Sequence, residues 1–261
     1  MSEILQLNNF AKLHNGTNIL FCKTDYLGAL FQHIQTWKRP CTLITGNSDY
    51  SITDDIVSHA PECITRWYAQ NADTTDLKVN GIPLGIENSE DCTLEGHGAG
   101  WEHAKEKVKL LKNSPEVSPR SKIYANFSLS THPSRKEVQK VCQALDYVTS
   151  QVSTDHAEIN NKSYSQYVND IQSHEMVVCP RGNGIDCHRV WEVLYLGRVP
   201  IVKRENAMRY FEELPILFID DWSHLRNIDY IENQYQKVKD NNSRMLDMNY
   251  WKSIIQGDKY V

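Results

Sequence analysis

Short apolar runs alternate with longer amphipathic segments along most of this chain. An apolar run of about four to eight residues between turn residues is typical of a strand, and apolar residues three and four positions apart predict a helix. Residues 133–145 show this helical spacing at Val138, Val141, Cys142 and Leu145. The predicted strands are residues 18–23, 41–46, 63–70, 79–86, 122–130, 147–153, 175–180, 199–202 and 215–220. The predicted helices are residues 27–37, 133–145, 163–173 and 187–197, with a helical tail after residue 228.

Strands separated by helices indicate βαβ units, which build mainly parallel sheets. The alternation is interrupted by residues 101–122, which begin as a charged amphipathic helix and end in Asn-Ser-Pro and Ser-Pro signals. We therefore predict an α/β protein with two Rossmann-like domains, residues 1–118 and residues 119–261. Ligands of such sheets bind beyond the carboxyl ends of the strands, so the crevice between the domains is the expected site.

Composition narrows the choice of partners and surroundings. The 261-residue chain has a formal net charge of -5, which does not favour binding to nucleic acid. Its seven cysteines have no framework spacing, as in proteins with reduced thiols. The sequence shows no signal-peptide pattern, and no apolar run approaches the roughly 20 residues needed to span a bilayer. We expect a cytoplasmic protein with no membrane span.

Residues 177–202, VVCPRGNGIDCHRVWEVLYLGRVPIV, place many polar groups between two apolar runs. Gly182 and Gly184 let the backbone approach a ligand closely. A helix that starts near Asp186 directs free N–H groups and a positive dipole end toward the loop. This arrangement suits a phosphate group.

Charged side chains of the same segment suit a nucleotide. Arg181 and Arg189 can each pair with a phosphate, and Glu192 can accept hydrogen bonds from the two hydroxyls of a ribose. Together they predict a nucleoside diphosphate site. The alternative stays open that the glycines belong to an ordinary strand-to-helix turn and that Asp186 only caps the helix.

Residues 179–202 resemble the donor-site signature of exostosin-like inverting glycosyltransferases, which have the two-domain GT-B fold. The shared pattern is Cys-Pro-x-Gly, a polar loop, an Arg, a Glu, a Gly and a strand that contains Pro. Residues 123–138, IYANFSLSTHPSRKEV, resemble the first strand, loop and helix of the same domain. The likeness covers residues 120–222, and over the first 118 residues it rests on the order of the elements. It is closest to the compact soluble forms found in microbes and large DNA viruses.

The resemblance implies a nucleotide-sugar donor and a glycan or glycoconjugate acceptor. Within the donor site, Arg135 and Arg189 would face the pyrophosphate and Glu192 would take the ribose hydroxyls. Asp186 and His188 would border the sugar or ribose. The expected donor is a UDP-sugar, for example UDP-xylose, with glucuronic acid, galactose and arabinose as other sugars. The expected donor-binding residues are Asn126, Arg135, Arg181, Asn183, Gly184, Asp186, His188, Arg189 and Glu192.

Glycosyltransferases of this kind usually need no metal, because arginines and a helix N-terminus neutralise the leaving diphosphate. The sequence contains no Asp-x-Asp motif, which agrees with this mechanism. We therefore expect no metal and no cofactor besides the nucleotide-sugar co-substrate. Cys92, His97 and His103 are residue types that bind metals, but their spacing is irregular.

An inverting transfer needs a general base, which in this fold comes from a loop after a strand of the N-terminal domain. Asp25, Asp49 and Asp73 each follow a predicted strand. We favour Asp73 because residues 66–73, RWYAQNAD, combine aromatic side chains that stack on sugars with amides that bind hydroxyls. The alternative for Asp73 is a solvated turn.

Two other functions stay open. One is a nucleotide-sugar-binding or carbohydrate-binding module without turnover, in which the donor motif persists and the base is absent. The other, a nicotinamide-dependent oxidoreductase, ranks last, because no Gly-x-Gly-x-x-Gly follows the first predicted strand.

Overall fold

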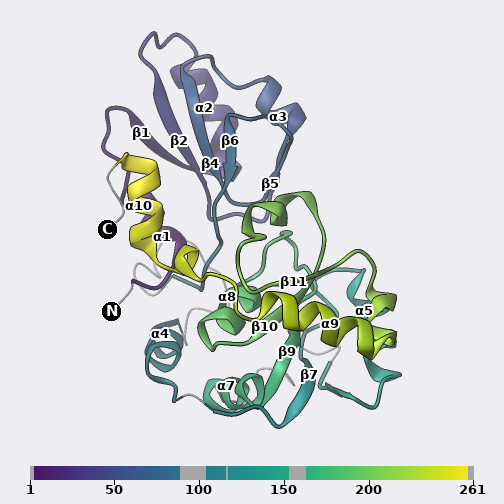
Figure 1. Cartoon of the computed structure of the whole chain (residues 1–261). Coiled ribbons are helices and arrows are strands. Elements are labelled where there is room, and N and C mark those ends of the chain that lie inside the picture. Colours follow the sequence, from purple (N-terminus) through teal and green to yellow (C-terminus); the bar gives the residue numbers. More distant parts are fainter. Residues whose placement is uncertain (1–2, 89–103, 116, 153–162, 258–261) are drawn as a thin grey trace.

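The computed structural model describes residues 3–88, 104–115, 117–152 and 163–257, which form two lobes (Figure 1). The first lobe is built on a four-stranded sheet with the order β1-β2-β4-β6, in which neighbouring strands are parallel. Its strands are β1 (Ile19–Lys23), β2 (Cys41–Gly46), β4 (Ile64–Ala69) and β6 (Val79–Gly81). A separate parallel pair consists of β3 (Ile52–Thr53) and β5 (Ala72–Asp73).

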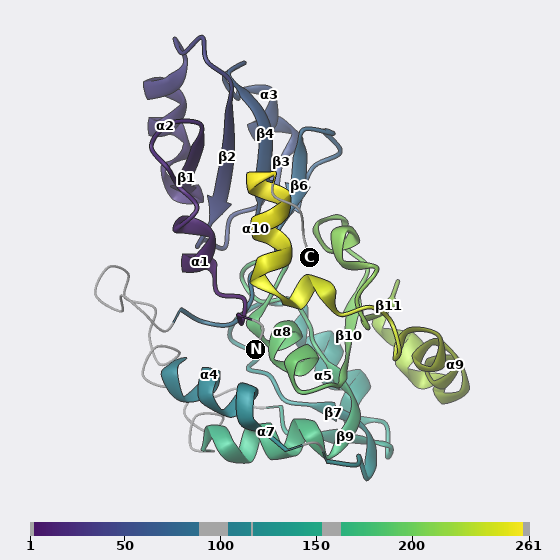
Figure 2. The same ribbon diagram turned by 60° about the vertical axis from the view of Figure 1, so that its left-hand side comes forward.

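Both faces of the first sheet are covered, because successive side chains of a strand point to opposite faces. Leu43 of β2 belongs to a core with residues of α2 (Leu27–Ile34) and α3 (Asp54–Ser58). The next residue, Ile44, belongs to a core with residues of α1 (Leu7–Ala11) and α10 (Met248–Gln256). The last helix of the chain therefore packs on the first lobe, beside α1 (Figure 2).

The second lobe is built on a five-stranded sheet with the order β11-β10-β9-β7-β8, and its neighbouring strands are parallel. Its strands are β7 (Ser121–Ala125), β8 (Val148–Ser150), β9 (His174–Val178), β10 (Val199–Lys203) and β11 (Leu217–Ile219). The chain starts this sheet at β7, adds β8 on one side and then β9 on the other. The order of the strands therefore reverses between β7 and β9.

Helices cover both faces of the second sheet. One face packs against α5 (Arg135–Gln143) and α9 (Ile228–Val238), and the other packs against α7 (Tyr164–Gln172) and α8 (His188–Tyr195). Short 3-10 helices complete the described chain: η1 (Thr24–Tyr26), η2 (Asn206–Phe211), η3 (Trp222–Arg226) and η4 (Arg244–Leu246). The prediction of an α/β protein with parallel sheets is confirmed.

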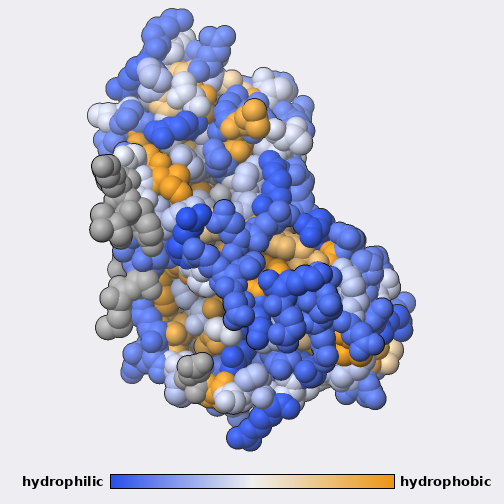
Figure 3. Space-filling model, in the orientation of Figure 1, coloured by the Kyte–Doolittle hydropathy of each residue, from blue (hydrophilic) through white to orange (hydrophobic). Residues whose placement is uncertain are grey.

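The segment between the two sheets contains α4 (Ala104–Asn113), which contacts α7 and α8 of the second lobe. The domain division at residue 118 stays a prediction, and the structure adds that α4, which precedes it, packs with the second lobe. On the face shown in Figure 3, hydrophilic residues predominate and hydrophobic residues form small separate patches. In the described part of the chain, every helix is too short or too polar to cross a bilayer.

Trp251 anchors α10 to the first lobe. Its ring packs edge-to-face against Phe10, with 6.1 Å between the centroids, and its indole N–H donates to the carbonyl of Met245 at 2.9 Å. The helix makes further contacts with the N-terminal segment, because the Met248 N–H donates to the Glu3 carbonyl at 3.2 Å. The first lobe therefore depends on a helix that follows the second lobe in sequence.

We expect Trp251→Ala to destabilise the protein by about 3–5 kcal/mol, because the truncation leaves a cavity between α10 and the first sheet. Urea unfolding followed by circular dichroism measures this loss. Ile254→Ala is the matched control, since Ile254 lies on the same helix and is 36% exposed. Equal losses in the two variants would show that α10 does not close the sheet.

Candidate functional site

Two loops of the second lobe meet where the order of its sheet reverses. The loop after β7 begins at Asn126, and the loop after β9 contains Arg181 and the two glycines. The carboxyl ends of two strands at a reversal of strand order are the usual ligand site of a doubly wound sheet. The loops that the sequence predicted as donor-binding therefore lie together at this position.

Arg135 connects these two loops. Its Nε donates to the Arg181 carbonyl at 2.7 Å, and one Nη donates to the Ser128 carbonyl at 2.8 Å and to Thr131 Oγ1 at 3.0 Å. The other Nη donates to the Pro180 carbonyl at 3.3 Å. These bonds use four of the five N–H groups of the guanidinium. Arg135 therefore holds the loops together, and its contact with a donor phosphate stays a prediction.

Two polar atoms near this point are buried without a hydrogen-bond partner among the described residues: Arg189 Nε and Asn126 Oδ1. Asn126 uses its other polar atom, Nδ2, to donate to the Tyr124 hydroxyl at 2.8 Å. Buried polar groups are nearly always paired, so these two atoms are candidate contacts for a ligand. A ligand with both acceptor and donor groups would satisfy them.

Positive charges converge on the same region of an otherwise acidic protein. Burial and the nearby Arg189 lower the pKa of Arg135 to about 10. The pKa of His132 is lowered by burial and by the charges of Arg181 and Arg135. Like charges repel each other, and an anion bound among them offsets this repulsion. The cluster of Arg135, Arg181 and Arg189 therefore favours an anionic ligand.

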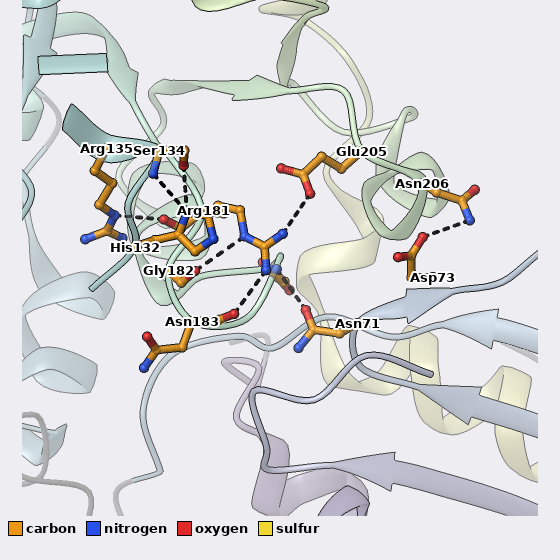
Figure 4. A network of polar contacts seen from close by, with 11 residues as sticks. Asn71, Asp73, His132, Ser134, Arg135, Arg181, Gly182, Asn183, Glu205 and Asn206 are labelled. Atoms are coloured by element: carbon orange, nitrogen blue, oxygen red, sulfur yellow. Dashed lines mark hydrogen bonds and ion pairs between the residues drawn. The ribbon is translucent and has the colours of Figure 1, made fainter. Parts of the chain in front are cut away.

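Arg181 lies at the junction of the two lobes (Figure 4). One of its Nη atoms is 3.3 Å from the carboxylate of Glu205, and the other donates to the Asn183 carbonyl at 3.1 Å. Glu205 comes just after β10 and is not among the site residues predicted from the sequence. The rule that functional side chains follow parallel strands would have found it, because Glu205 is the third residue after the apolar run 199–202.

Gly184 and Asp186 lie against the first lobe. A Cβ atom on Gly184 would be 2.9 Å from Asn71 Nδ2, so glycine permits the close approach of the two lobes. The Asp186 N–H donates to Asn71 Oδ1 at 2.9 Å, and the Asp186 carboxylate accepts from the Leu84 N–H at 2.8 Å. The same carboxylate accepts from the indole N–H of Trp191 at 2.9 Å. Asp186 therefore joins the lobes.

His188 also joins the lobes, since its Nδ1 lies 2.8 Å from the Gly85 carbonyl. It is the first residue of α8, and the N-cap of this helix is Cys187, which makes no side-chain capping bond. The alternative in which Asp186 caps the helix is therefore wrong. The roles of Asp186 and His188 beside a donor sugar stay predictions.

Glu192 is the centre of a buried polar cluster. Its carboxylate is 2.8 Å from Lys107 Nζ, accepts from the Tyr167 hydroxyl at 2.8 Å and lies 3.4 Å from the Tyr164 hydroxyl. Lys107 also pairs with Glu87. Side chains of α4 and α7 thus surround Glu192, the residue that the sequence predicted to bind the ribose hydroxyls. The two tyrosines, three residues apart on one helix face, were the signal that the sequence analysis missed.

Asp73 is the base candidate that faces the second lobe, whose Asn206 Nδ2 donates to Asp73 Oδ1 at 3.1 Å (Figure 4). The opposite end of this amide is held by Arg209, which donates to Asn206 Oδ1. Asp25 and Asp49 are exposed, and Asp25 lies 3.9 Å from Lys23. Of the three candidates, Asp73 is therefore the one whose described contact reaches the second lobe, at η2.

The aromatic reason for favouring Asp73 is wrong. Trp67 is fully buried and donates its indole N–H to Thr45 Oγ1 at 2.8 Å, and Tyr68 is also buried. The exposed rings that follow strands of this lobe are Tyr26 and Tyr50, which are 63% and 64% exposed. The exposed rings that could stack on a sugar therefore directly follow Asp25 and Asp49 in the sequence, and not Asp73.

Residues that could bind a metal do not cluster in the part of the chain that the structure describes: no three His, Cys, Asp or Glu side chains are grouped there. Cys92, His97 and His103 lie outside the described residues. The expectation that no metal takes part stays a prediction.

A family model described as the RXYLT1 C-terminal domain matches residues 106–256. Among solved structures, one titled "Crystal Structure of alpha1,3-Fucosyltransferase" aligns over 94% of this chain and 80% of that chain, with 11% identity and a TM-score of 0.47. The comparison with curated proteins found no match.

Asp186 gives a prediction about pH. Burial raises the pKa of its carboxyl to about 6, although the Leu84 N–H and the Trp191 indole act in the opposite direction. A carboxyl whose pKa is higher in the folded state binds protons better there. It therefore destabilises the fold as pH rises from the unfolded pKa, near 4, toward 6.

We expect the stability of the wild type, relative to Asp186→Asn, to fall by roughly 2 kcal/mol between pH 4.5 and pH 6.5. The amide does not titrate, so the difference between the two proteins isolates Asp186. Urea unfolding at several pH values measures it. A difference that stays constant with pH would mean that Asp186 titrates as an ordinary carboxyl.

Proposed function

The chain belongs to the RXYLT1 C-terminal domain family, and we propose that it is a glycosyltransferase that moves a sugar from a nucleotide diphosphate sugar to a hydroxyl of a glycan or glycoconjugate. The matched residues 106–256 include both loops of the candidate site. The exostosin-like affiliation of the same loops stays a prediction.

One observation carries the donor proposal. The guanidinium groups of Arg135, Arg181 and Arg189 converge at the carboxyl ends of β7 and β9, and the Nε of Arg189 is buried without a partner among the described residues. A diphosphate supplies two negative groups and many acceptor oxygens to such a cluster. Asn126 Oδ1, the second unpaired atom, needs a donor, such as a hydroxyl or amide of the nucleotide sugar.

The same cluster supports a chemical role. Breaking the bond between sugar and diphosphate leaves negative charge on the leaving oxygen, and fixed positive groups stabilise that charge. We propose that the arginines perform this work without a metal. The proposed donor is a UDP-sugar such as UDP-xylose, and this choice rests on the resemblance of the donor loops.

Asp73 is the proposed general base. It lies on the first lobe, and its Oδ1 accepts a hydrogen bond from Asn206 of the second lobe. In the proposed reaction its other oxygen, Oδ2, receives the proton of the acceptor hydroxyl. Taking the proton from the acceptor as the hydroxyl attacks the sugar carbon would give transfer with inversion.

For the donor site, we expect Arg189→Ala to weaken UDP binding at least about tenfold, because a charge-assisted contact worth roughly 1.5–3 kcal/mol is lost. Uridine, which lacks the phosphates, should lose much less affinity. Calorimetric titration of both ligands measures the difference. The control is Arg204→Ala, which removes an exposed arginine that pairs with Glu212 and Asp220. Equal losses for UDP and uridine would contradict a phosphate role for Arg189.

For the base, we expect Asp73→Asn to lower the transfer rate by about 10²–10⁴ while donor affinity barely changes. Product formation from a mass-resolved donor measures the rate, and UDP titration of the same variant measures affinity. Asp25→Asn and Asp49→Asn are the controls and should lose far less activity. The same assay in excess chelator should keep its rate if no metal takes part.

Near-normal turnover of Asp73→Asn would reject this base and leave Asp25 and Asp49 as the candidates. A wild type that binds a nucleotide sugar tightly but transfers to no acceptor in a broad glycan screen would instead support a binding module.

A further inference from the structure

Glu205 is the charged partner of Arg181 in the described structure. The two side chains come from the carboxyl ends of neighbouring strands, β9 and β10, and their charged atoms are 3.3 Å apart. Both are accessible, with 27% of the Arg181 side chain and 25% of the Glu205 side chain exposed. Both side chains are therefore partly open to solvent near the junction of the two lobes (Figure 4).

The other bonds of Arg181 are to neutral groups of its own loop. Its Nε lies 3.4 Å from the Gly182 carbonyl, and an Nη donates to the Asn183 carbonyl at 3.1 Å. These contacts hold the guanidinium in place but do not neutralise it. Within the described residues, the negative charge opposite Arg181 comes from Glu205.

Glu205 lies in surroundings that do not suit a carboxylate without its cation. Burial raises the pKa of Glu205, and the Asp73 carboxylate of the first lobe adds to this, while Arg181 and Lys203 act in the opposite direction. Asp73 is held near by the 3.1 Å bond from Asn206, the residue that follows Glu205. The positive charge of Arg181 therefore offsets the repulsion that Glu205 experiences from Asp73 of the first lobe.

We propose that Glu205 occupies, in the donor-free protein, the position on Arg181 that a donor phosphate takes, so that donor binding exchanges one anion for another. The inference rests on the proposed function, because it requires a diphosphate ligand. It adds a competitor that the donor must displace. Glu205 would thus be a positioning residue, which keeps Arg181 oriented and neutralised until the donor arrives.

The exchange has a consequence for protons. When a phosphate takes Arg181, Glu205 loses its closest cation and faces Asp73, with Lys203 as the remaining positive group. Protonation of Glu205 removes the repulsion, so donor binding should take up a proton from the solvent. Lower pH should therefore weaken the competition between Glu205 and the phosphate for Arg181.

His132 complicates a measurement of pH dependence alone. It lies near Arg181 and Arg135, and it also gains positive charge as pH falls. The substitution Glu205→Gln separates the two effects, because it removes the carboxylate and leaves His132 in place. Glu212→Gln is the matched control, since Glu212 pairs with Arg204 at 2.6 Å on the exposed side of the same region.

The test is calorimetric titration of UDP, inorganic pyrophosphate and uridine at pH 5.5 and 7.5, in two buffers of different ionisation enthalpy. At pH 7.5, Glu205→Gln should bind UDP and pyrophosphate about fivefold more tightly than the wild type, and its gain should shrink at pH 5.5. Uridine affinity should not change, and Glu212→Gln should match the wild type. Proton uptake on UDP binding should be smaller in Glu205→Gln than in the wild type. Glu205→Ala is a second variant that should also bind UDP more tightly.

Two results would overturn the inference, and they are distinguishable. If the wild type binds UDP but both Glu205 variants bind it equally or more weakly, Glu205 does not compete with the phosphate, and the proposed function stands. If the wild type binds neither UDP nor pyrophosphate, the diphosphate site and the exchange fail together.

Discussion

Arg135 places a positive charge in the interior of the second lobe, where burying an ion without compensation costs several kcal/mol. Hydrogen bonds to carbonyls of the loops after β7 and β9 offset this cost and keep the loops together. The charge remains, because carbonyl groups are neutral. Arg181 and Arg189 add to it in the same region. An anion between the loops is the arrangement that relieves this repulsion, so the contact that shapes the site also selects the charge of its ligand.

Carboxylates of the protein itself meet part of this positive charge. Glu205 pairs with Arg181, and Glu192, which pairs with Lys107, also acts on Arg189 and raises its pKa. Glu205 follows β10, and Glu192 lies on α8. Buried or partly buried cations are costly without an opposite charge, and these carboxylates supply part of it. If the proposed donor binds here, it must compete with them for the arginines.

The two lobes are joined both covalently and through Asp186. Its backbone bonds Asn71 and its carboxylate bonds Leu84 of the first lobe and Trp191 of the second. The helix α10 returns from the second lobe to close the first sheet. These contacts set the relative position of the lobes, and with it the position of Asp73 opposite Glu205 and Arg181. A base on one lobe and a donor site on the other would depend on that spacing.

Local pattern was sufficient to predict the longer strands and helices, because strand and helix periodicity are properties of neighbouring residues. It did not predict the short elements β3, β5, α1 and α3. The motif in residues 177–202 also carried the proposed chemistry, since its arginines follow a buried strand. Tertiary structure alone decided the rest. The sequence around Trp67 and Tyr68 does not show whether these rings are buried or exposed. They are buried because helices cover both faces of the first sheet. Asp186 joined the lobes and Glu205 met Arg181 because segments distant in sequence came into contact. Such contacts depend on which faces pack together, and no short-range pattern specifies them.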